Sequence, residues 1–577
     1  FRGLKARFPI PILATVASLS FLYNESFSMW GGNSLSTLAG QFAHLYAFNF
    51  FLLAIGALQF ELSRKRFPWI SSFLLGAVLL SHFYVALYLP LVFLCFLFFE
   101  KTESFQARFK KLLLAGLSAL GLAAWFVIPM LHNAKWNTAF GLKWSGAKLF
   151  QEAFPLIFWP FAFLAGLFCL LFLAFAFLKR DFIERETQLI LPLLIFLILG
   201  SVIYYFIFPP LGLVDIRIFP ALQMSLCFFA ALAVGLFLNR MLPQTWVLFL
   251  TVFLVLIGLW WPFRQIHNFS PWMKWNYSGW QSKEAYSDLK NLSRDLQGSL
   301  SDPRVIYENS DLSNIAGSMR VFEMLPYFAN RSTMESVYMQ ATILAPAAFY
   351  LQALISKTPS CPFPNYQCTG YNLSQLKFYM PLMGISQLIL ISPEVRNQAG
   401  RLDFLDFKDQ YGIWYLYDSK IPTALVEVLR EAPRFIPEKN FKSEFYNWFL
   451  AYTGQEPFLV VAPEKDQPRI LQSVGHQECH ANVTVDFRQI KLTTDCPGRF
   501  HILKFAFHST WKASTGDSLY LMSPGFIGFI PSQSEVTLTW GRHWLWTLSD
   551  LFSWLVLLSL LVIWAKSWMR NRRERKA

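Results

Sequence analysis

The 577-residue chain is poor in charge, because Asp, Glu, Lys and Arg together make up only 15% of it. Soluble domains carry roughly 25% charged residues. In contrast, 54% of the residues are hydrophobic and 60 of them are Phe. A soluble protein would have to bury this excess in one core, and single cores stop growing at about 250–300 residues. The composition therefore excludes a soluble enzyme, a disordered tail and a fibrous protein, and it predicts a polytopic membrane protein.

The net charge of +14 does not come from the large polar part of the chain. The positive excess lies in residues 1–262 and in the tail from Lys566, whereas residues 263–565 are neutral. A nucleic-acid partner would require a basic patch on a folded domain. We therefore predict no nucleic-acid partner, and we interpret the charge as a topology signal, since cytoplasmic loops are enriched in Lys and Arg.

Apolar runs of suitable length predict the membrane spans. They are residues 8–23, 42–60, 112–131, 153–178, 188–208, 219–238, 245–262 and 546–565. Residues 67–99 are also apolar except for Ser81-His82, and they are too long for one span and short for two. The charge bias favours two crossings, or a re-entrant hairpin, with Ser81-His82 at its outer tip. Ten crossings place the C-terminal tail in the cytoplasm and residues 263–545 on the extracytoplasmic side of the membrane.

The predicted fold is a polytopic α-helical membrane protein with a large extracytoplasmic domain before the last span. That domain should combine an α/β part with a jelly-roll-like β-sandwich, because alternating apolar residues such as Val536, Leu538 and Trp540 are typical of strands. The predicted domains are a transmembrane domain of about nine spans (1–262), an interfacial aromatic linker (263–300), an α/β subdomain (301–440), a β-sandwich subdomain (441–545) and a last helix with a basic tail (546–577).

Four of the seven cysteines lie in the predicted outer domain. An even number of cysteines in an oxidising compartment indicates disulfides. We predict Cys361–Cys368 across a Pro-rich loop and Cys479–Cys496 across a hairpin. A zinc site that includes His476 and His480 is the alternative, although the ligand motif has no second half. The remaining cysteines, which fall inside predicted helices, are expected to be small hydrophobic residues; they are Cys95, Cys169 and Cys227.

The predicted spans lack Lys, Arg and Glu, which argues against an ion-coupled pump or exporter, since such proteins carry charge at mid-membrane. Chemistry is instead expected at the outer ends of the helices. Arg217 could bind a lipid phosphate through two parallel N–H groups. Asp215 could orient Arg217, bind a divalent cation such as Mg²⁺ or Mn²⁺, or act as a base. The alternative is a local Asp–Arg pair that fixes the loop.

Other polar residues at the same predicted side are further candidates. Glu25 is a second candidate base, and its alternative is a solvated carboxylate. His82 is the ionisable residue within 67–99, so it is expected to face a cavity; a neutral imidazole bonded to a carbonyl is the alternative. His44 and Asn33 complete the set of candidate substrate-binding residues.

The chain also contains short motifs spread over most of its length. They are MWGGNSLSTLAG (29–40), LSHFY (80–84), DIRIFP (215–220), RVFEMLP (320–326), MESVY (334–338), HSTWK (508–512) and SPGF (523–526). These motifs resemble a family of large bacterial membrane proteins labelled "6-pyruvoyl-tetrahydropterin synthase-related". That family in turn is similar to the GT-C superfamily of polytopic glycosyltransferases.

The resemblance implies a transferase in a bacterial inner membrane that moves a sugar from a polyprenyl-phosphate carrier to an envelope lipid, glycan or protein on the outer face. It implies a lipid-phosphate contact for Arg217 and a pocket position for His82. GT-C enzymes carry their catalytic Asp or Glu in the first outer loop, so the resemblance places that residue upstream of Phe1. A different expectation is a non-enzymatic scaffold, or a lipid-binding component of an envelope assembly complex, in which the β-lobe is the functional part.

Overall fold

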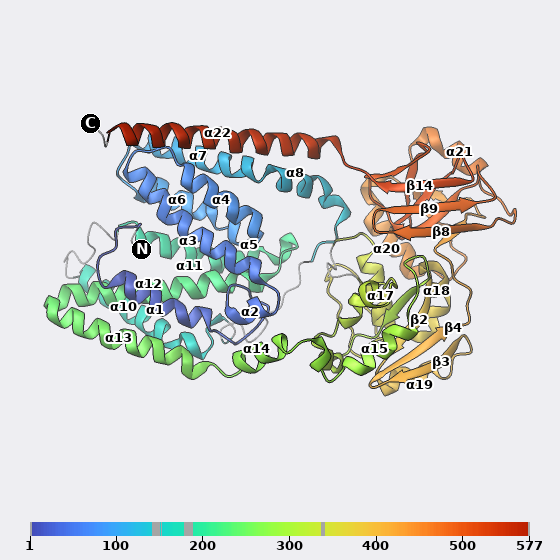
Figure 1. Cartoon of the computed structure of the whole chain (residues 1–577), viewed down its shortest axis with the longest axis horizontal. Coiled ribbons are helices and arrows are strands. Elements are labelled where there is room, and N and C mark those ends of the chain that lie inside the picture. The colour runs from blue at the N-terminus through green and yellow to red at the C-terminus, as the bar shows by residue number, and fades with distance from the viewer. Residues whose placement is uncertain (1–2, 141–150, 152, 178–187, 336–340, 575–577) are drawn as a thin grey trace. The chain divides into compact units, whose positions relative to one another are not determined.

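The computed structural model describes residues 3–140, 151, 153–177, 188–335 and 341–574 (Figure 1). The chain forms two compact units. Unit 1 comprises residues 1–132, 141–277 and 544–577, and unit 2 comprises residues 133–140 and 278–543. Residues 133–140 were predicted in the transmembrane domain, but they belong to unit 2 because Trp136 is buried in its core.

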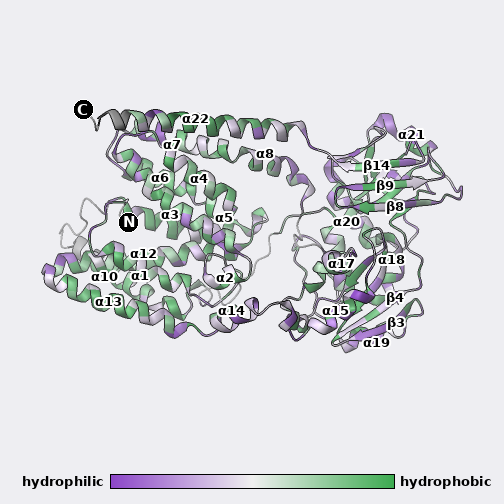
Figure 2. Ribbon diagram, viewed as in Figure 1, coloured by the Kyte–Doolittle hydropathy of each residue, from purple (hydrophilic) through white to green (hydrophobic). Residues whose placement is uncertain are grey.

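Unit 1 is a bundle of apolar helices, which Figure 2 shows as mostly hydrophobic ribbons. Five helical segments in the described part are long and apolar enough to cross a membrane. They are α3 (Phe42–Ser63), α11 (Ile190–Ile207), η5 with α12 (Asp215–Ile218 and Phe219–Met241), α13 (Gln244–Gln265) and α22 (Trp544–Glu574). Exposed apolar side chains cover α13 and α22, as expected for helices that face lipid.

The other predicted spans correspond to shorter or bent helices. The shorter ones are α1 (Ile10–Leu22), α4 (Trp69–Ser81), α5 (Phe83–Ala86) with α6 (Leu89–Phe99), and the apolar part of α10 (Trp159–Phe177). Span 112–131 is not straight, because α7 (Phe105–Leu122) and α8 (Ala124–Asn133) meet at a bend of 72°. The prediction of a helix-rich unit with helices long and apolar enough to cross a membrane is confirmed, whereas the number of crossings stays a prediction.

Residues 67–99 reverse direction at His82, which separates α4 from α5. At its start, α4 is tied to the end of α3, because Glu61 accepts hydrogen bonds from the N–H groups of Ile70 (2.8 Å) and Ser71 (3.1 Å). After the turn, α6 runs back along α11, with Cys95 reaching the carbonyl of Leu189. The segment is therefore a helical hairpin, as predicted.

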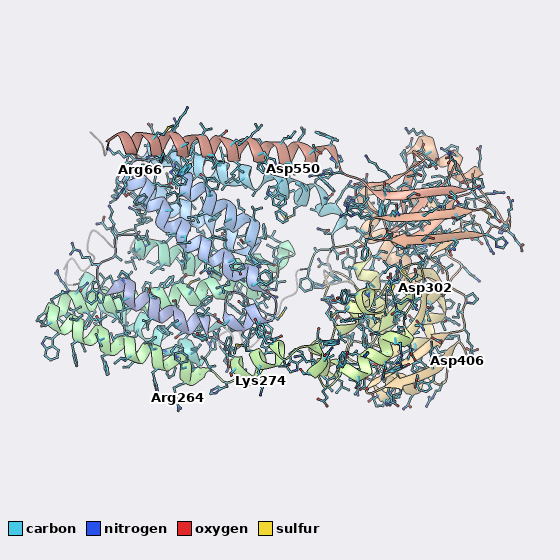
Figure 3. All side chains as sticks on the ribbon, viewed as in Figure 1. Arg66, Arg264, Lys274, Asp302, Asp406 and Asp550 are labelled. Atoms are coloured by element: carbon cyan, nitrogen blue, oxygen red, sulfur yellow. A yellow bond between two sulfur atoms is a disulfide. The ribbon has the colours of Figure 1, made fainter. Side chains whose placement is uncertain are left out.

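Helix ends meet in two groups, as an antiparallel bundle requires. In one group, Asn239 donates to the carbonyl of Phe8 (2.9 Å), and Trp69 packs near Trp564. Arg66 lies near the C-terminal end of α22, whereas Asp550 lies toward its other end (Figure 3). The other group of helix ends contains the candidate site.

Unit 2 begins with a four-stranded sheet of order β1-β2-β4-β3. Its strands are β1 (Arg304–Tyr307), β2 (Ile385–Leu390), β3 (Leu405–Tyr411) and β4 (Trp414–Ser419). β1 and β2 are parallel, and the other pairs are antiparallel. The helices that follow β1 in this part include α16 (Leu325–Phe328), α17 (Ala345–Leu354), α18 (Leu376–Met383), α19 (Pro393–Ala399) and α20 (Phe441–Ala451). The separate sheet region is confirmed.

Two further sheets form a sandwich around a shared core. One has the order β5-β10-β13-β12-β7-β6 and the other β11-β14-β9-β8. The strands are β5 (Val426–Val428), β6 (Arg434–Phe435), β7 (Leu459–Val461), β8 (Ala481–Asp486), β9 (Gln489–Thr494), β10 (His501–Ala506), β11 (Trp511–Ala513), β12 (Leu519–Met522), β13 (Phe526–Phe529) and β14 (Glu535–Trp540). Leu503 and Phe529 pack against Ile490 and Val536 of the opposite sheet.

The sandwich differs from the prediction in two respects. It begins at β5, before the predicted boundary at residue 441, because β5 pairs with β10. Its sheets have six and four strands and include a parallel β6–β7 pair, whereas a jelly roll has eight strands in two Greek keys. The alternation of apolar and polar residues located the strands, but it did not show which strands pair with one another.

The predicted linker 263–300 is also divided between the units. Its first half forms α14 (Phe269–Tyr277) in unit 1. Its second half forms α15 (Tyr286–Asp295), whose Leu289 and Leu292 are buried in the core of unit 2. This second half is therefore part of the folded domain and not a linker.

Both predicted disulfides, Cys361–Cys368 and Cys479–Cys496, are present, each with 5.8 Å between its Cα atoms. Cys95 and Cys227 are free and buried, and Cys169 is free and exposed.

Candidate functional site

Three loop segments of unit 1 meet around Arg217, and one of them contacts its guanidinium. Nη1 of Arg217 donates to the carbonyl oxygen of Met29 (2.6 Å) and to Oε1 of Gln41. Tyr84 holds the same loop, because its hydroxyl accepts the N–H of Val214 (2.7 Å). The motifs at 29–40, 80–84 and 215–220, which are far apart in the sequence, therefore meet at one place.

The Gly31-Gly32 turn is shaped by this close packing. Gly31 has a φ of +94°, and a Cβ atom there would overlap the imidazole of His44. Asn33 follows the turn and caps the short helix α2 (Ser34–Leu38), since its Oδ1 accepts the N–H of Ser36 (2.7 Å). Asn33 is therefore a buried capping residue beside the site.

His44 and His82 form a stacked pair. Their ring centroids are 4.2 Å apart, and the planes differ by 8°. His44 comes from the first turn of α3, and His82 from the break between α4 and α5. Nδ1 of His82 is buried and has no hydrogen-bond partner in the described structure. The structure thus brings together the two predicted histidines, in a cluster that also contains Arg217.

Asp215 and Arg217 share the short helix η5, which leads into α12. Asp215 is completely buried. The sequence allowed a local pair between Asp215 and Arg217, but the two hydrogen bonds of the Arg217 guanidinium among the described residues are made to the loop that contains Met29 and Gln41. Arg217 is therefore anchored by a different loop.

The carboxylate of Glu25 is engaged by another helix. It accepts the backbone N–H groups of His267 (2.8 Å), Asn268 (2.7 Å) and Phe269. These groups lie at the start of α14, where unpaired N–H groups favour a negative charge. Glu25 thus acts as a cap for α14, and three of the roughly four acceptor sites of its carboxylate are used for this.

The described residues contain one group of at least three closely spaced potential metal ligands, Cys479, Asp495 and Cys496. Both cysteines are joined in a disulfide, so their sulfur atoms are not available as thiolates. His480 is tied to this hairpin through its backbone N–H, which donates to Asp495 (2.8 Å).

Sequence reasoning missed Gln41, Tyr84 and the carbonyl of Met29. Tyr84 lies in a motif that the sequence singled out, and it could have been found there. Met29 also lies in such a motif, but its role belongs to a backbone carbonyl, which residue type does not reveal. The roles of Gln41 and Met29 depend on contacts with Arg217 that are 176 and 188 residues apart in sequence.

The arrangement can bind an anion. Among the described residues, both hydrogen bonds of Arg217 use Nη1, so the N–H groups on Nε and Nη2 remain for a ligand. Guanidinium groups bind phosphate oxygens through two parallel N–H groups. Arg217 is only partly exposed, which strengthens such an interaction, because a partly buried charge is less screened by water.

No protein-family model matches the chain, and no curated protein matches it either.

Proposed function

We propose that the chain is a GT-C-like membrane glycosyltransferase that uses a polyprenyl-phosphate-linked sugar. In the reaction, the bond between the sugar C1 and the phosphate oxygen breaks, and a bond forms between C1 and an acceptor oxygen. The acceptor hydroxyl loses its proton to a carboxylate, and polyprenyl phosphate leaves as an anion. The acceptor would be an envelope lipid, glycan or protein on the outer face of a bacterial inner membrane.

The observation that carries the proposal is the meeting of three motif segments around Arg217. Tethering by Met29 and Gln41 fixes the guanidinium before a ligand arrives. A preorganised positive charge stabilises negative charge that develops on the leaving phosphate. A polyprenyl tail is too apolar to leave the bilayer, so its phosphate should be bound where membrane helices end.

The two candidate carboxylates fit this reaction unequally. Asp215 lies two residues from Arg217 and is buried, whereas Glu25 is held by the start of α14. We therefore assign a supporting role at the site to Asp215 rather than to Glu25. A divalent cation, if the reaction uses one, would be bound jointly by Asp215 and the phosphate.

Replacement of Arg217 tests the proposal. In proteoliposomes that contain radiolabelled polyprenyl-phosphate hexoses, we expect Arg217→Ala to lower sugar transfer by about 100-fold or more, since such charge-stabilising donors contribute that much. Arg217→Lys should retain part of the activity, because it keeps the charge but not the two parallel N–H groups. Arg264→Ala, at an exposed position at the end of α13, is the matched control. Normal transfer by Arg217→Ala would contradict the proposal.

A scaffold is the second candidate function, and one observation favours it. Arg217 joins the loop around Gln41 to the loop before α12, as a purely structural clamp would. In that case Arg217→Ala should lower the thermal midpoint in detergent, and no polyprenyl-phosphate hexose should be consumed by the wild-type protein. Loss of transfer with an unchanged midpoint would favour the enzyme.

A further inference from the structure

Unit 2 contains a second candidate site, a groove of about 670 Å³ beside the sandwich. It runs between β11, an edge strand of the four-stranded sheet, and β12 and β7 of the six-stranded sheet. The groove includes the HSTWK motif (508–512), which the proposed function does not use. We define the groove by Trp136, Lys465, Asp466, His508, Trp511 and Lys512.

Aromatic rings form much of the groove. Trp136 contacts Phe507 and His508, with centroids 5.3 and 5.7 Å away. Trp511 packs against Trp540, whose ring is also stacked on His508 at 4.8 Å. Flat aromatic faces of this kind pack well against the C–H faces of sugar rings, which combine an apolar face with polar edges.

Trp136 carries an unused donor. Its side chain is only 4% exposed, and its indole N–H has no partner in the described structure. A buried donor without a partner costs free energy, so a ligand hydroxyl that accepted a hydrogen bond from it would be stabilised. By contrast, the indole N–H of Trp511 donates to the carbonyl of Ala506 (3.3 Å).

The charges of the groove are balanced. Its basic residues are Lys135, Lys465 and Lys512, and its acidic residues are Glu438, Asp466 and Asp517. Lys135 pairs with Glu438 at 3.0 Å and also lies over the Trp136 ring. A phosphate site would have an excess of positive charge, whereas sugar hydroxyls both donate and accept hydrogen bonds and therefore match a mixture of donors and acceptors.

We propose that this groove binds a carbohydrate chain, with a sugar ring on Trp511, a hydroxyl bonded to the Trp136 indole N–H, and further hydroxyls bonded to Lys512 and Asp466. The proposal rests on unit 2 alone and does not require that the chain transfers sugars. Where the proposed transferase function holds, the bound glycan is its acceptor.

The test is glycan binding by the full chain in mild detergent. The labelled protein is applied to an array of bacterial envelope polysaccharides and linear oligosaccharides, and the strongest ligand is then titrated. We expect Trp136→Phe to weaken binding by roughly 5- to 10-fold, the usual effect of one lost hydrogen bond. Lys512→Ala should weaken binding as well, and Lys408→Ala, on the exposed face of β3, should not.

A stability measurement separates this role from a structural one. Trp136→Phe removes a donor that has no partner within the described residues, so the thermal midpoint should stay the same or rise. Three outcomes would overturn the proposal: no binding to any glycan of the array, unchanged glycan binding by Trp136→Phe, or a Trp136-dependent preference for proline-rich peptides over glycans. Failure of sugar transfer alone would affect only the proposed function.

Discussion

At the scale of single residues, Glu335 connects two motifs that the sequence left without a role. Its carboxyl group is buried and accepts hydrogen bonds from the Tyr307 hydroxyl (3.1 Å) and from Gln352. Arg320 and Glu323 of the RVFEMLP motif are close enough to influence it electrostatically. Burial raises the pKa of Glu335 from its ordinary value of 4.5 to about 8, so the group is mostly protonated at neutral pH.

This shift predicts how stability depends on pH. Between pH 4.5 and 8 the folded chain holds a proton on Glu335 that the unfolded chain has released. The free energy of unfolding should therefore fall as pH rises, by at most about 1.4 kcal/mol per pH unit from this group. We expect the thermal midpoint of Glu335→Gln to change less with pH between pH 5 and 8 than that of the wild type, because Gln is neutral throughout this range.

Glu394→Gln is the control for this measurement. Glu394 is paired with Lys357, which lowers the pKa of its carboxyl group, so it does not titrate between pH 5 and 8. The same pH slope in the wild type and in Glu335→Gln would contradict the assignment.

Glu25 leads to a second prediction at this scale. Its carboxylate caps α14, so Glu25→Ala should destabilise that helix by about 1 kcal/mol, as lost caps do. Limited proteolysis should then cut residues 266–277 faster than in the wild type, while sugar transfer should persist. Loss of transfer with unchanged proteolysis would instead make Glu25 a catalytic residue.

At the scale of elements, the sequence predicted those features that depend on local pattern. Alternation located β14, whose Val536 and Leu538 are buried while its ends are exposed. Cysteine number and spacing located the disulfides. Features that depend on long-range contacts were not predictable, such as the bonds between Glu25 and residues 267–269 or the burial of Trp136 in unit 2. Periodicity describes which face of an element is buried, but it does not specify which element covers that face.

The β8–β9 hairpin provides a prediction at the element scale. Cys479–Cys496 closes a loop with a sequence separation of 17 residues, for which chain entropy gives a stabilisation of roughly 3 kcal/mol. The double variant Cys479→Ser/Cys496→Ser should therefore have a lower thermal midpoint than the wild type. Reductant should lower the midpoint of the wild type much more than that of this variant. Equal midpoints for the oxidised wild type and the variant would contradict this role, and Cys95→Ser, at a free cysteine, serves as the control.

At the scale of the whole molecule, the arrangement of helix ends bears on how the chain sits in a membrane. Charged residues follow the last turn of α3 at Arg64, Lys65 and Arg66, in the group of helix ends away from the candidate site. Cytoplasmic loops are enriched in such residues. The site, in which Arg217 is the one strongly basic residue among those that the structure describes, should then face outward together with the segments that lead into unit 2.

Thiol labelling of intact cells tests this orientation. In a Cys169→Ala background, a cysteine at Asp406, an exposed position in β3, should react with a membrane-impermeant maleimide. A cysteine at the exposed position Arg64 should react only after the cells are permeabilised, because the bilayer separates it from the reagent. The reverse pattern would place Arg217 in the cytoplasm, where a donor sugar carried by an outward-facing lipid could not reach it. Labelling at both positions before permeabilisation would mean that α3 does not end on the cytoplasmic side.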